Sequence, residues 1–427
     1  MLDNHNFQNV KVSKLAQNLI GSEIIKIGNQ VNDLKAEGKK IANLTIGDLN
    51  SSIYPIPSEL EKGIQKAYQN NLTNYPPANG LSILREAVSQ DIKERYDLSY
   101  TPDDVLVAGG SRPLIYACYQ SIVDPGDKVV YPTPSWNNNH YAYLTSAQSV
   151  EVQTSAENNF LPTAEDLKPH LKGAVLLALC SPLNPTGTMY TKEQLERICE
   201  LVLQENKSRK EGEKPLYLMY DQIYAMLTFE NEHFNPVSLN AEMKPYTVFI
   251  DGSSKCFAAT GVRVGWGFGP SEVISKMKAF LSHIGAWAPK PEQHAVGEFL
   301  KDSEEVDTFV TKFKGEISES LSLLHSGIQR MKSEGFKVDS IVPMGALYLT
   351  IELDYIGYKT PEGVELKDTM DLVSYLIKEA GVALVPFSAF GNKSDFPWFR
   401  ASVGGVSKQE VEELFEGLQK AISALVL

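Results

Sequence analysis

Short runs of consecutive apolar residues recur between residues 105 and 269, and polar or amphipathic stretches separate them. Continuous rather than alternating apolar residues are what strands need when both of their faces are covered. Helices covering a sheet are the simplest way to cover both faces, so the pattern predicts an α/β fold. The runs lie at 105–108, 128–131, 174–177, 216–220, 247–250 and 263–266.

The pattern changes after about residue 301. A long polar stretch with helical character comes first, and strand-like runs follow at 347–351 and 382–385. Ser407 with Glu410 forms the capping-box pattern, and an apolar stripe behind it predicts a final amphipathic helix. Because 427 residues exceed the roughly 250–300 of a single core, we expect a second, smaller α+β lobe with a ligand cleft between the lobes.

Charge and cysteine content exclude several kinds of partner. The 40 Lys and Arg against 53 Asp and Glu give a formal net charge of −13, which disfavours docking on nucleic acid or an anionic membrane. The four cysteines form neither a CxxC pair nor a cluster with histidine, so we expect no metal site and no disulfide scaffold. The sequence shows no signal peptide and no apolar run near the ~20 residues of a membrane span, which predicts a cytoplasmic location.

Lys255 lies among small residues, and Arg263 follows eight positions later. A lysine amine condenses reversibly with a carbonyl group to form a Schiff base. An arginine fork suits a phosphate dianion better than a point charge does. The pattern can therefore hold an aldehyde cofactor covalently and grip its phosphate, although a surface lysine beside a strand is the simpler alternative.

A glycine-rich turn, Gly109-Gly110-Ser111-Arg112-Pro113, follows the first apolar run. Pro113 suits the first position of a helix. The backbone N–H groups of Gly110, Ser111 and Arg112 would then point at an anion beyond the helix N-terminus. An ordinary tight turn into a helix is the alternative.

Two proline-rich loops carry candidate ligands for a flat ring. Trp136 follows two prolines at the end of a strand, where a rigid loop could lay the indole against the ring; a core tryptophan is the alternative. Asn184-Pro185 lies in a dense turn that fixes the direction of the Asn side chain, with a cis or a trans peptide bond left open.

Asp221 ends a strongly apolar strand, and Tyr224 follows three residues later. A carboxylate there is costly unless it is paired, which makes Asp221 a candidate for an ion pair with a protonated pyridine nitrogen. Tyr224 could then hydrogen-bond a phenolic oxygen of the same ring. A helix-capping aspartate is the alternative interpretation.

The order and spacing of these motifs resemble the class I and II aminotransferases of fold type I, the aspartate aminotransferase-like enzymes that depend on pyridoxal 5′-phosphate. The resemblance runs from about Gly47 to Gly404. It implies a large domain over residues 51–300, an α/β unit with a mostly parallel seven-stranded sheet covered by helices. It also implies an N-terminal segment, 1–50, that packs on the small domain, and a linker helix with a smaller α+β C-terminal domain over 301–427.

The resemblance implies a role for each motif. Lys255, Asp221 and Tyr224 are the expected catalytic residues: Lys255 would carry the internal aldimine and Asp221 would pair with the ring nitrogen. Tyr224 and Asn184 would bind the ring oxygen, and Trp136 would stack on the ring. The residues expected to hold the phosphate are Gly110, Ser111, Arg112, Ser253 and Arg263. Relatives often place a serine where this chain has Gly252, which leaves open whether Ser253 or Ser254 substitutes for it.

Two further matches concern the substrate and the assembly. Arg400, in Trp398-Phe399-Arg400, matches the arginine that binds the substrate carboxylate, and Gly47, Trp136 and Asn184 complete the expected substrate contacts. Tyr75 matches a tyrosine that reaches the phosphate of the neighbouring subunit. The resemblance therefore implies a homodimer with shared sites.

The implied reaction is amino-group transfer between an L-amino acid and a 2-oxo acid by a ping-pong mechanism, with Lys255 as general base and acid. A lyase or decarboxylase on the same fold is the alternative enzyme, and a non-catalytic regulatory module is the alternative outside enzymes. Which amino acid is used stays open. His283, Trp287 and Lys290 could line the substrate pocket or be ordinary loop residues.

Overall fold

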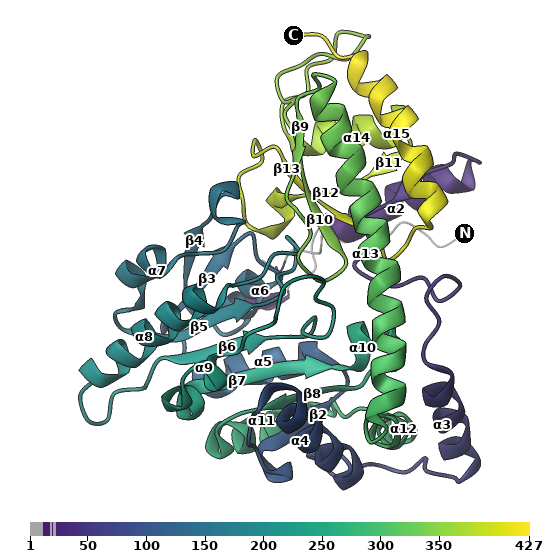
Figure 1. Cartoon of the computed structure of the whole chain (residues 1–427). Coiled ribbons are helices and arrows are strands. Elements are labelled where there is room, and N and C mark those ends of the chain that lie inside the picture. The colour runs from purple at the N-terminus through teal and green to yellow at the C-terminus, as the bar shows by residue number, and fades with distance from the viewer. Residues whose placement is uncertain (1–11, 18, 20–22) are drawn as a thin grey trace.

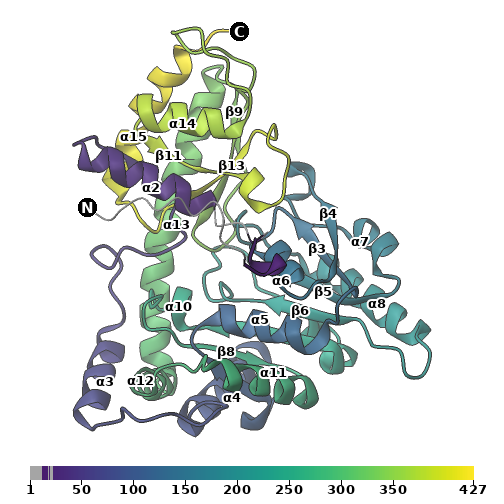
Figure 2. The same cartoon turned by 180° about the vertical axis from the view of Figure 1, so that it is seen from behind.

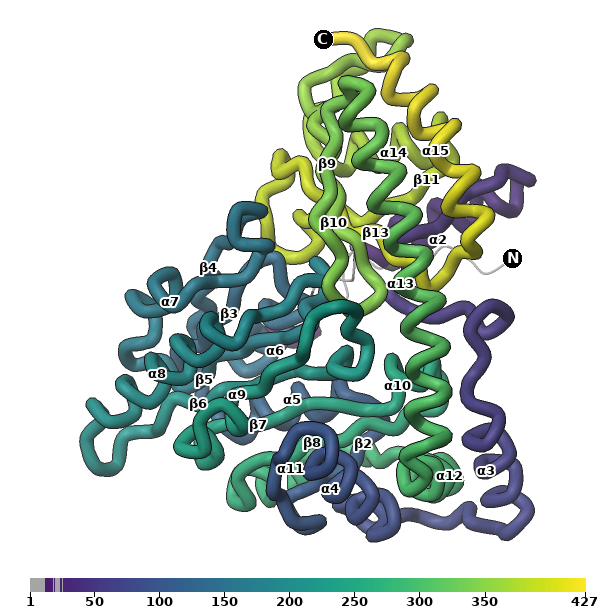
Figure 3. Tube along the Cα trace, viewed as in Figure 1, coloured from purple at the N-terminus to yellow at the C-terminus, as the bar shows by residue number. Residues whose placement is uncertain are grey.

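The computed structural model describes residues 12–17, 19 and 23–427. A large lobe is built on a seven-stranded sheet, and a smaller lobe is built on a four-stranded sheet (Figure 1). The tube in Figure 3 shows helix α13 (Ser303–Ser333) running from the base of the large lobe into the small lobe. The predicted fold class is therefore confirmed, while the domain limits at residues 50 and 300 stay predictions.

The large sheet is mostly parallel, and its strands follow the order β2-β8-β7-β6-β5-β3-β4. Strand β8 is antiparallel to both of its neighbours. Six strands lie at the predicted apolar runs, whereas β4 was missed because most of its side chains are exposed at the edge of the sheet. The strands are β2 (Val105–Ala108), β3 (Lys128–Thr133), β4 (Gln148–Gln153), β5 (Ala174–Cys180), β6 (Tyr217–Asp221), β7 (Thr247–Gly252) and β8 (Gly265–Phe268).

Helices cover both faces of this sheet. Helices α5 (Ser111–Ile122), α6 (Asn138–Leu144) and α11 (Ser271–Ile284) pack on one face. The other face is covered by α3 (Ser58–Gln69), α4 (Ser82–Tyr96), α7 (Ala164–Leu171), α8 (Lys192–Ser208) and α12 (Lys290–Leu300). Burial on both faces explains why the central strands read as continuous apolar runs.

The small lobe surrounds the antiparallel sheet β12-β13-β10-β9. Its strands are β9 (Val338–Ser340), β10 (Tyr348–Leu353), β12 (Val385–Pro386) and β13 (Trp398–Ser402), and its helices are α14 (Thr369–Glu379) and α15 (Lys408–Ser423). The Ser407 capping box at α15 is confirmed, and the apolar stripe of that helix is buried.

The N-terminal part of the chain joins the small lobe. Strand β1 (Ala42–Asn43) pairs in parallel with β11 (Val382–Ala383), and helix α2 (Glu23–Ala36) lies beside the same lobe (Figure 2). The first eleven residues of the predicted N-terminal segment lie outside the described part of the chain.

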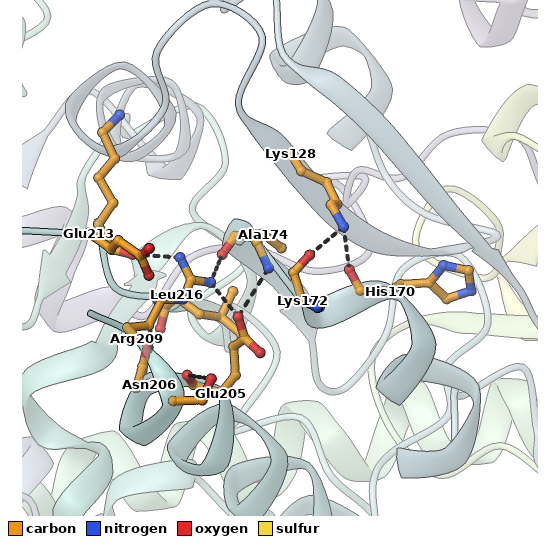
Figure 4. A network of polar contacts seen from close by, with 12 residues as sticks. Lys128, His170, Lys172, Ala174, Glu205, Asn206, Arg209, Glu213 and Leu216 are labelled. Atoms are coloured by element: carbon orange, nitrogen blue, oxygen red, sulfur yellow. Dashed lines mark hydrogen bonds and ion pairs between the residues drawn. The ribbon is translucent and has the colours of Figure 1, made fainter.

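Side chains of α8 and the loop after it fix the amino ends of the central strands (Figure 4). Arg209 Nη2 donates to the Ala174 carbonyl at 2.5 Å and pairs with Glu205 at 2.9 Å. The Asn206 amide donates to the Leu216 carbonyl at 3.0 Å and accepts from its N–H at 2.7 Å. Because these strands are parallel, their carboxyl ends meet at the opposite edge, where ligands bind in open α/β sheets.

Candidate active site

A cleft of about 740 Å³ lies at the carboxyl ends of β5 and β6, and residues of both lobes line it. The cleft brings together most of the predicted site residues, which come from distant parts of the chain. Those that line it are Gly47, Ser111, Arg112, Trp136, Asn184, Asp221, Tyr224, Lys255, Arg263 and Arg400. A separate groove of about 690 Å³ beside α2 and α14 holds none of them.

Lys255 lies on the short helix α10 (Ser253–Cys256), which follows β7 directly. Its Nζ atom donates to the Gly47 carbonyl at 2.5 Å. Gly47 lies in the segment that connects β1 of the small lobe with α3 of the large lobe. Burial lowers the pKa of Lys255 to about 8; Asp48 acts in the opposite direction, and Arg400, Arg112 and Arg263 lower it further. A large neutral fraction at physiological pH is what an amine nucleophile needs.

Asp221 stands at the end of β6, next to Cys180 of β5 and Ile250 of β7 in the sheet register. Its Oδ1 accepts the N–H of Ile223 at 3.1 Å, and no basic group of the described residues pairs with it. Burial raises the pKa of Asp221 to about 6, although the Ile223 hydrogen bond lowers it. A cationic ring nitrogen would supply the missing partner.

Arg400 is 1% exposed, yet no carboxylate of the described residues pairs with it. Its Nη1 donates to Asn184 Oδ1 at 3.1 Å and its Nη2 donates to the Thr45 carbonyl at 2.6 Å. The buried Nε has no hydrogen-bond partner among the residues that the structure describes. Neutral acceptors hold this guanidinium in place and leave its charge uncompensated, which suits an anionic ligand.

Tyr348, for which the sequence predicted no role, contacts two of the predicted site residues. Its hydroxyl lies 2.6 Å from that of Tyr224, and its ring centroid lies 4.7 Å from the guanidinium carbon of Arg400. A Cβ atom on Gly47 would stand 2.9 Å from the Tyr348 hydroxyl, so Gly47 gives this ring room.

Arg263 closes the other end of the cleft against the glycine-rich turn. Its Nη1 donates to the Thr260 carbonyl at 2.7 Å and its Nη2 donates to the Gly109 carbonyl at 2.9 Å. A Cβ atom on Gly110 would lie only 2.3 Å from Nη2, and Gly110 has a φ of +96°. Only glycine fits this position without strain.

The predicted start of the helix after this turn was wrong. Helix α5 begins at Ser111 rather than at Pro113, and the N–H of Gly110 already donates to the Ala108 carbonyl at 2.7 Å. Gly110 therefore leaves room for Arg263, but its backbone N–H is already engaged and cannot donate to a ligand. Ser111 and Arg112 line the cleft. Proline is also tolerated deeper in the first turn of a helix, which is why its position did not fix the start.

The two serines before Lys255 differ in direction. Ser253 is fully buried and its hydroxyl donates to the Val264 carbonyl at 2.9 Å. Ser254 lines the cleft. The geometry therefore favours Ser254 as the serine that meets a ligand, and a ligand role for Ser253 has no support from its surroundings.

The aromatic loop and the proline turn also reach the cleft. Trp136 lines the cleft, and its ring centroid lies 6.3 Å from that of Phe390. The guanidinium carbon of Arg112 lies 5.1 Å from the centroid of the Trp136 ring. The Asn184-Pro185 peptide bond is cis, and the Asn184 side chain meets Arg400.

The remaining predicted residues lie away from the cleft. Tyr75 is 81% exposed and packs edge to face on Trp287, with ring centroids 5.3 Å apart. Lys290 Nζ donates to Asn74 Oδ1 at 2.5 Å, and neither Lys290, Trp287 nor His283 lines the cleft of its own chain.

The donor set fits a phosphorylated pyridine ring with an amino acid beside it. Four basic side chains and two carboxylates, those of Asp48 and Asp221, line the cleft, which leaves an excess of positive charge for a phosphate and a carboxylate. Within residues 12–17, 19 and 23–427, no group of three or more His, Cys, Asp or Glu could hold a metal ion. The described helices include none that could cross a membrane.

Residues 39–418 match the family model "Aminotransferase class I and II". The chain is 30% identical over 389 residues to the aspartate/prephenate aminotransferase of Thermus thermophilus, covering 89% of this chain and 92% of the relative. Among solved structures, the aspartate aminotransferase of Rhizobium meliloti has a TM-score of 0.88 at 26% identity, covering 98% of this chain and 100% of that chain. The Thermus thermophilus aspartate aminotransferase with maleate has a TM-score of 0.85 at 27% identity and covers 97% and 100%.

The match in sequence extends over nearly the whole chain, and the fold with its cleft agrees with it. The chain therefore belongs to the class I and II aminotransferase family and is a pyridoxal phosphate-dependent aminotransferase that acts on amino acids and 2-oxo acids.

Proposed function

We propose that this aminotransferase holds pyridoxal phosphate on Lys255 and takes its amino group from an acidic L-amino acid such as aspartate. The observation that carries the residue roles is the meeting of Lys255, Asp221 and Arg400 in one cleft. When bound, the cofactor supplies an aldehyde that condenses with amines and a ring that accepts electrons from the substrate Cα.

Each side chain has a separate task in this proposal. Arg400 holds the substrate α-carboxylate in a bidentate fork, which fixes the orientation of the Cα–H bond. The Lys255 amine, displaced by the substrate amine, would remove the proton from Cα and deliver it to the former aldehyde carbon of the cofactor. Asp221 keeps the ring nitrogen protonated, and Tyr224 with Asn184 hydrogen-bonds the ring oxygen. Ser111, Ser254 and Arg263 hold the phosphate, and Trp136 lies on the ring.

The substrate class rests on Arg112 and on the relatives. If Arg263 takes the phosphate and Arg400 takes the α-carboxylate, Arg112 is a third guanidinium in the same cleft. The relatives include aspartate and aspartate/prephenate aminotransferases, and one structure is of a complex with maleate, a dicarboxylate. A second carboxylate on the substrate would match this extra charge.

Arg112→Gln separates this assignment from the predicted role of Arg112 at the phosphate. If Arg112 reads the substrate, kcat/KM for aspartate should fall at least tenfold more than kcat/KM for alanine, the loss of about 1.4 kcal/mol or more that removal of one charged partner gives. If Arg112 holds the phosphate instead, the variant should lose affinity for pyridoxal phosphate and both substrates should suffer equally.

We propose in addition that the protein is a homodimer in which Tyr75 reaches the active site of the partner. Tyr75 is exposed although it is aromatic, and Ile284, near its contact Trp287, is exposed as well. The Gly109 N–H donates to the Ala286 carbonyl at 2.9 Å, so this exposed apolar region borders the phosphate turn. Exposed apolar surface beside a ligand site favours an interface there.

Mixed dimers test the exchange of Tyr75. Tyr75→Ala and Lys255→Ala should each be impaired alone, but a dimer formed from one chain of each contains one site with both residues if Tyr75 acts across the interface. Recovery of activity on mixing supports the proposal. No recovery, with mixed dimers shown by mass spectrometry, would place Tyr75 in the site of its own chain. The predicted cytoplasmic location stays a prediction.

A further inference from the structure

A buried polar cluster lies on the face of the large sheet that is turned away from the cleft. Strand side chains alternate between faces. Met219 and Ile250 pack with α5 on the cleft side, whereas Tyr220 and Phe249 pack in the core on the α4 side. Asp221 points to the same side as Met219 and therefore faces the cleft. Gln222, which follows Asp221, and Asp251, which follows Ile250, point to the other side and face α4.

Asp251 accepts two hydrogen bonds in this cluster. Its Oδ1 accepts the N–H of Gly252 at 2.7 Å, and its Oδ2 accepts from Gln222 Nε2 at 3.1 Å. The backbone ladder between β6 and β7 ends next to this contact, where the Gln222 N–H donates to the Ile250 carbonyl at 2.9 Å. The Asp251 side chain thus extends the pairing of the two strands by one step beyond their backbone bonds.

The two partners of Asp251 are neighbours of the reacting residues. Gln222 follows Asp221 in the chain, and Gly252 precedes α10, the helix that carries Lys255. Gly252 packs directly on the backbone of β8, because a Cβ atom there would lie 2.8 Å from the Cα of Gly265. A displacement of this turn would therefore be passed on to Lys255 and to strand β8, which follows Arg263.

We propose that Asp251 is a positioning residue for the amino-transfer reaction: its carboxyl group ties the strand end that carries Asp221 to the turn that carries Lys255. This inference rests on the proposed roles of Lys255 and Asp221. Asp251 touches neither substrate nor cofactor, since it lies on the opposite face of the sheet. It acts by holding the proton-transferring amine and the ring-facing carboxylate in fixed relative positions, to which reaction rates are sensitive at the level of about 1 Å.

The surroundings of Asp251 contain several ionisable groups. Asp91 and Tyr96 come from α4, Cys256 comes from α10, and Asp221 comes from the cleft side. Arg95 of α4 pairs with Asp91 at 2.7 Å, so its charge is already engaged. Burial raises the pKa of Asp251 to about 8, although its two hydrogen bonds lower it. A protonated carboxyl group can accept the Gly252 N–H and donate its own proton to Gln222 Oε1 once the Gln222 amide turns over, so the tie persists in both protonation states.

The test compares Asp251→Ala with Asp251→Asn. Alanine removes both acceptors, and we expect kcat to fall about tenfold to hundredfold with KM for the amino acid changed less than about threefold, because Arg400 is untouched. Asparagine keeps an acceptor for Gly252. Its amide can meet Gln222 Oε1, a buried atom without a partner in the described part of the chain, once the Gln222 amide turns over. Asp251→Asn should therefore keep kcat within about threefold of the wild type.

A second readout needs no turnover. In the cofactor-free protein, the pH midpoint for acetylation of the Lys255 amine should move by more than about 0.3 units in Asp251→Ala, because the position of the amine among its charged neighbours changes. Asp251→Asn should leave this midpoint unchanged. Gln222→Ala, which removes one tie only, serves as the milder variant if Asp251→Ala does not fold.

Asn206→Ala is the matched control. It also removes two hydrogen bonds of one side chain, in this case both to the backbone of Leu216 at the amino end of β6 (Figure 4). It should therefore lower stability without changing kcat or the Lys255 midpoint. A folded, cofactor-loaded Asp251→Ala protein with kcat within about twofold of the wild type would overturn the proposal. Equal damage from Asp251→Asn and Asp251→Ala would overturn it too, while absence of amino transfer in the wild type would instead refute the proposed function.

Discussion

The Lys255 amine should titrate far below an ordinary lysine, and this can be measured without cofactor. Its pKa lies near 8 instead of 10.5. At pH 7.5 about a quarter of the amines are then neutral, against roughly one in a thousand for an ordinary lysine, which is a gain of about two orders of magnitude in reactive amine. Burial is the main cause, and the cationic lining of the cleft adds to it.

Asp48→Asn is the perturbation that tests this electrostatic account. Asp48 raises the pKa of Lys255, whereas the arginines lower it. Its carboxylate accepts from Thr260 Oγ1 at 2.5 Å and from the Leu49 N–H at 2.8 Å, and asparagine can keep both bonds through its carbonyl oxygen. Removing the charge should lower the pKa of Lys255 by up to about one unit, with the exposure of Asp48 reducing the effect.

Competitive acetylation with a trace of acetic anhydride, followed by peptide mass spectrometry, gives the titration midpoint of Lys255 in both proteins. Free Nα-acetyl-lysine in the same solution is the reference. We expect a midpoint near 8 for the wild type and a lower one for Asp48→Asn. Labelling that keeps rising to pH 10 in the wild type, or a midpoint that rises in Asp48→Asn, would refute the reasoning.

Three further predictions follow from single contacts. Tyr348→Phe removes the 2.6 Å hydrogen bond to Tyr224 but keeps the ring beside Arg400. In steady-state assays kcat/KM should therefore fall about tenfold, the equivalent of about 1.4 kcal/mol. A loss below about twofold would contradict the role of this bond. Gly110→Ala places a methyl group 2.3 Å from Arg263 Nη2. The Kd for pyridoxal phosphate should therefore rise at least about tenfold in an absorbance titration. An unchanged Kd would mean that Arg263 can move freely. The pKa of Asp251 is about 8 in the folded state, so its carboxyl group binds a proton more readily there than in the unfolded chain. The contribution of this protonation to the free energy of unfolding is complete below about pH 4 and is lost as the pH rises through 8. Urea unfolding of cofactor-free protein at pH 5 and pH 8 should therefore show a smaller loss of stability for Asp251→Asn than for the wild type, and equal losses would show that this carboxyl does not titrate in that range.

The sequence predicted the fold where burial left a clear pattern. The central strands are covered on both faces and read as apolar runs, whereas β4 lies at the edge with mostly exposed side chains and leaves no such run. The Ser407 capping box marked the start of α15 correctly because both of its hydrogen bonds are local. Pro113 did not mark the start of α5, since proline fits several positions of a first turn.

The candidate site was predictable for residues whose chemistry is rare at such a position. A lysine among small residues and an aspartate at the end of an apolar strand stand out in the sequence, and the structure places both in the cleft. Tyr348 and Asp251 act through contacts with residues far away in the chain or on a neighbouring strand. Only the packing of the two lobes and the strand register bring these contacts together, so local patterns carry no sign of them.

A single half-reaction tests the central claim most directly. Protein loaded with pyridoxal phosphate is mixed with L-aspartate without any 2-oxo acid, and the visible absorbance band and the released product are measured together. We predict loss of the band with one oxaloacetate formed per active site, no release of ammonia or carbon dioxide, and no oxaloacetate from Lys255→Ala. A band that persists in the wild type, or release of carbon dioxide or ammonia in place of the oxo acid, would contradict the account.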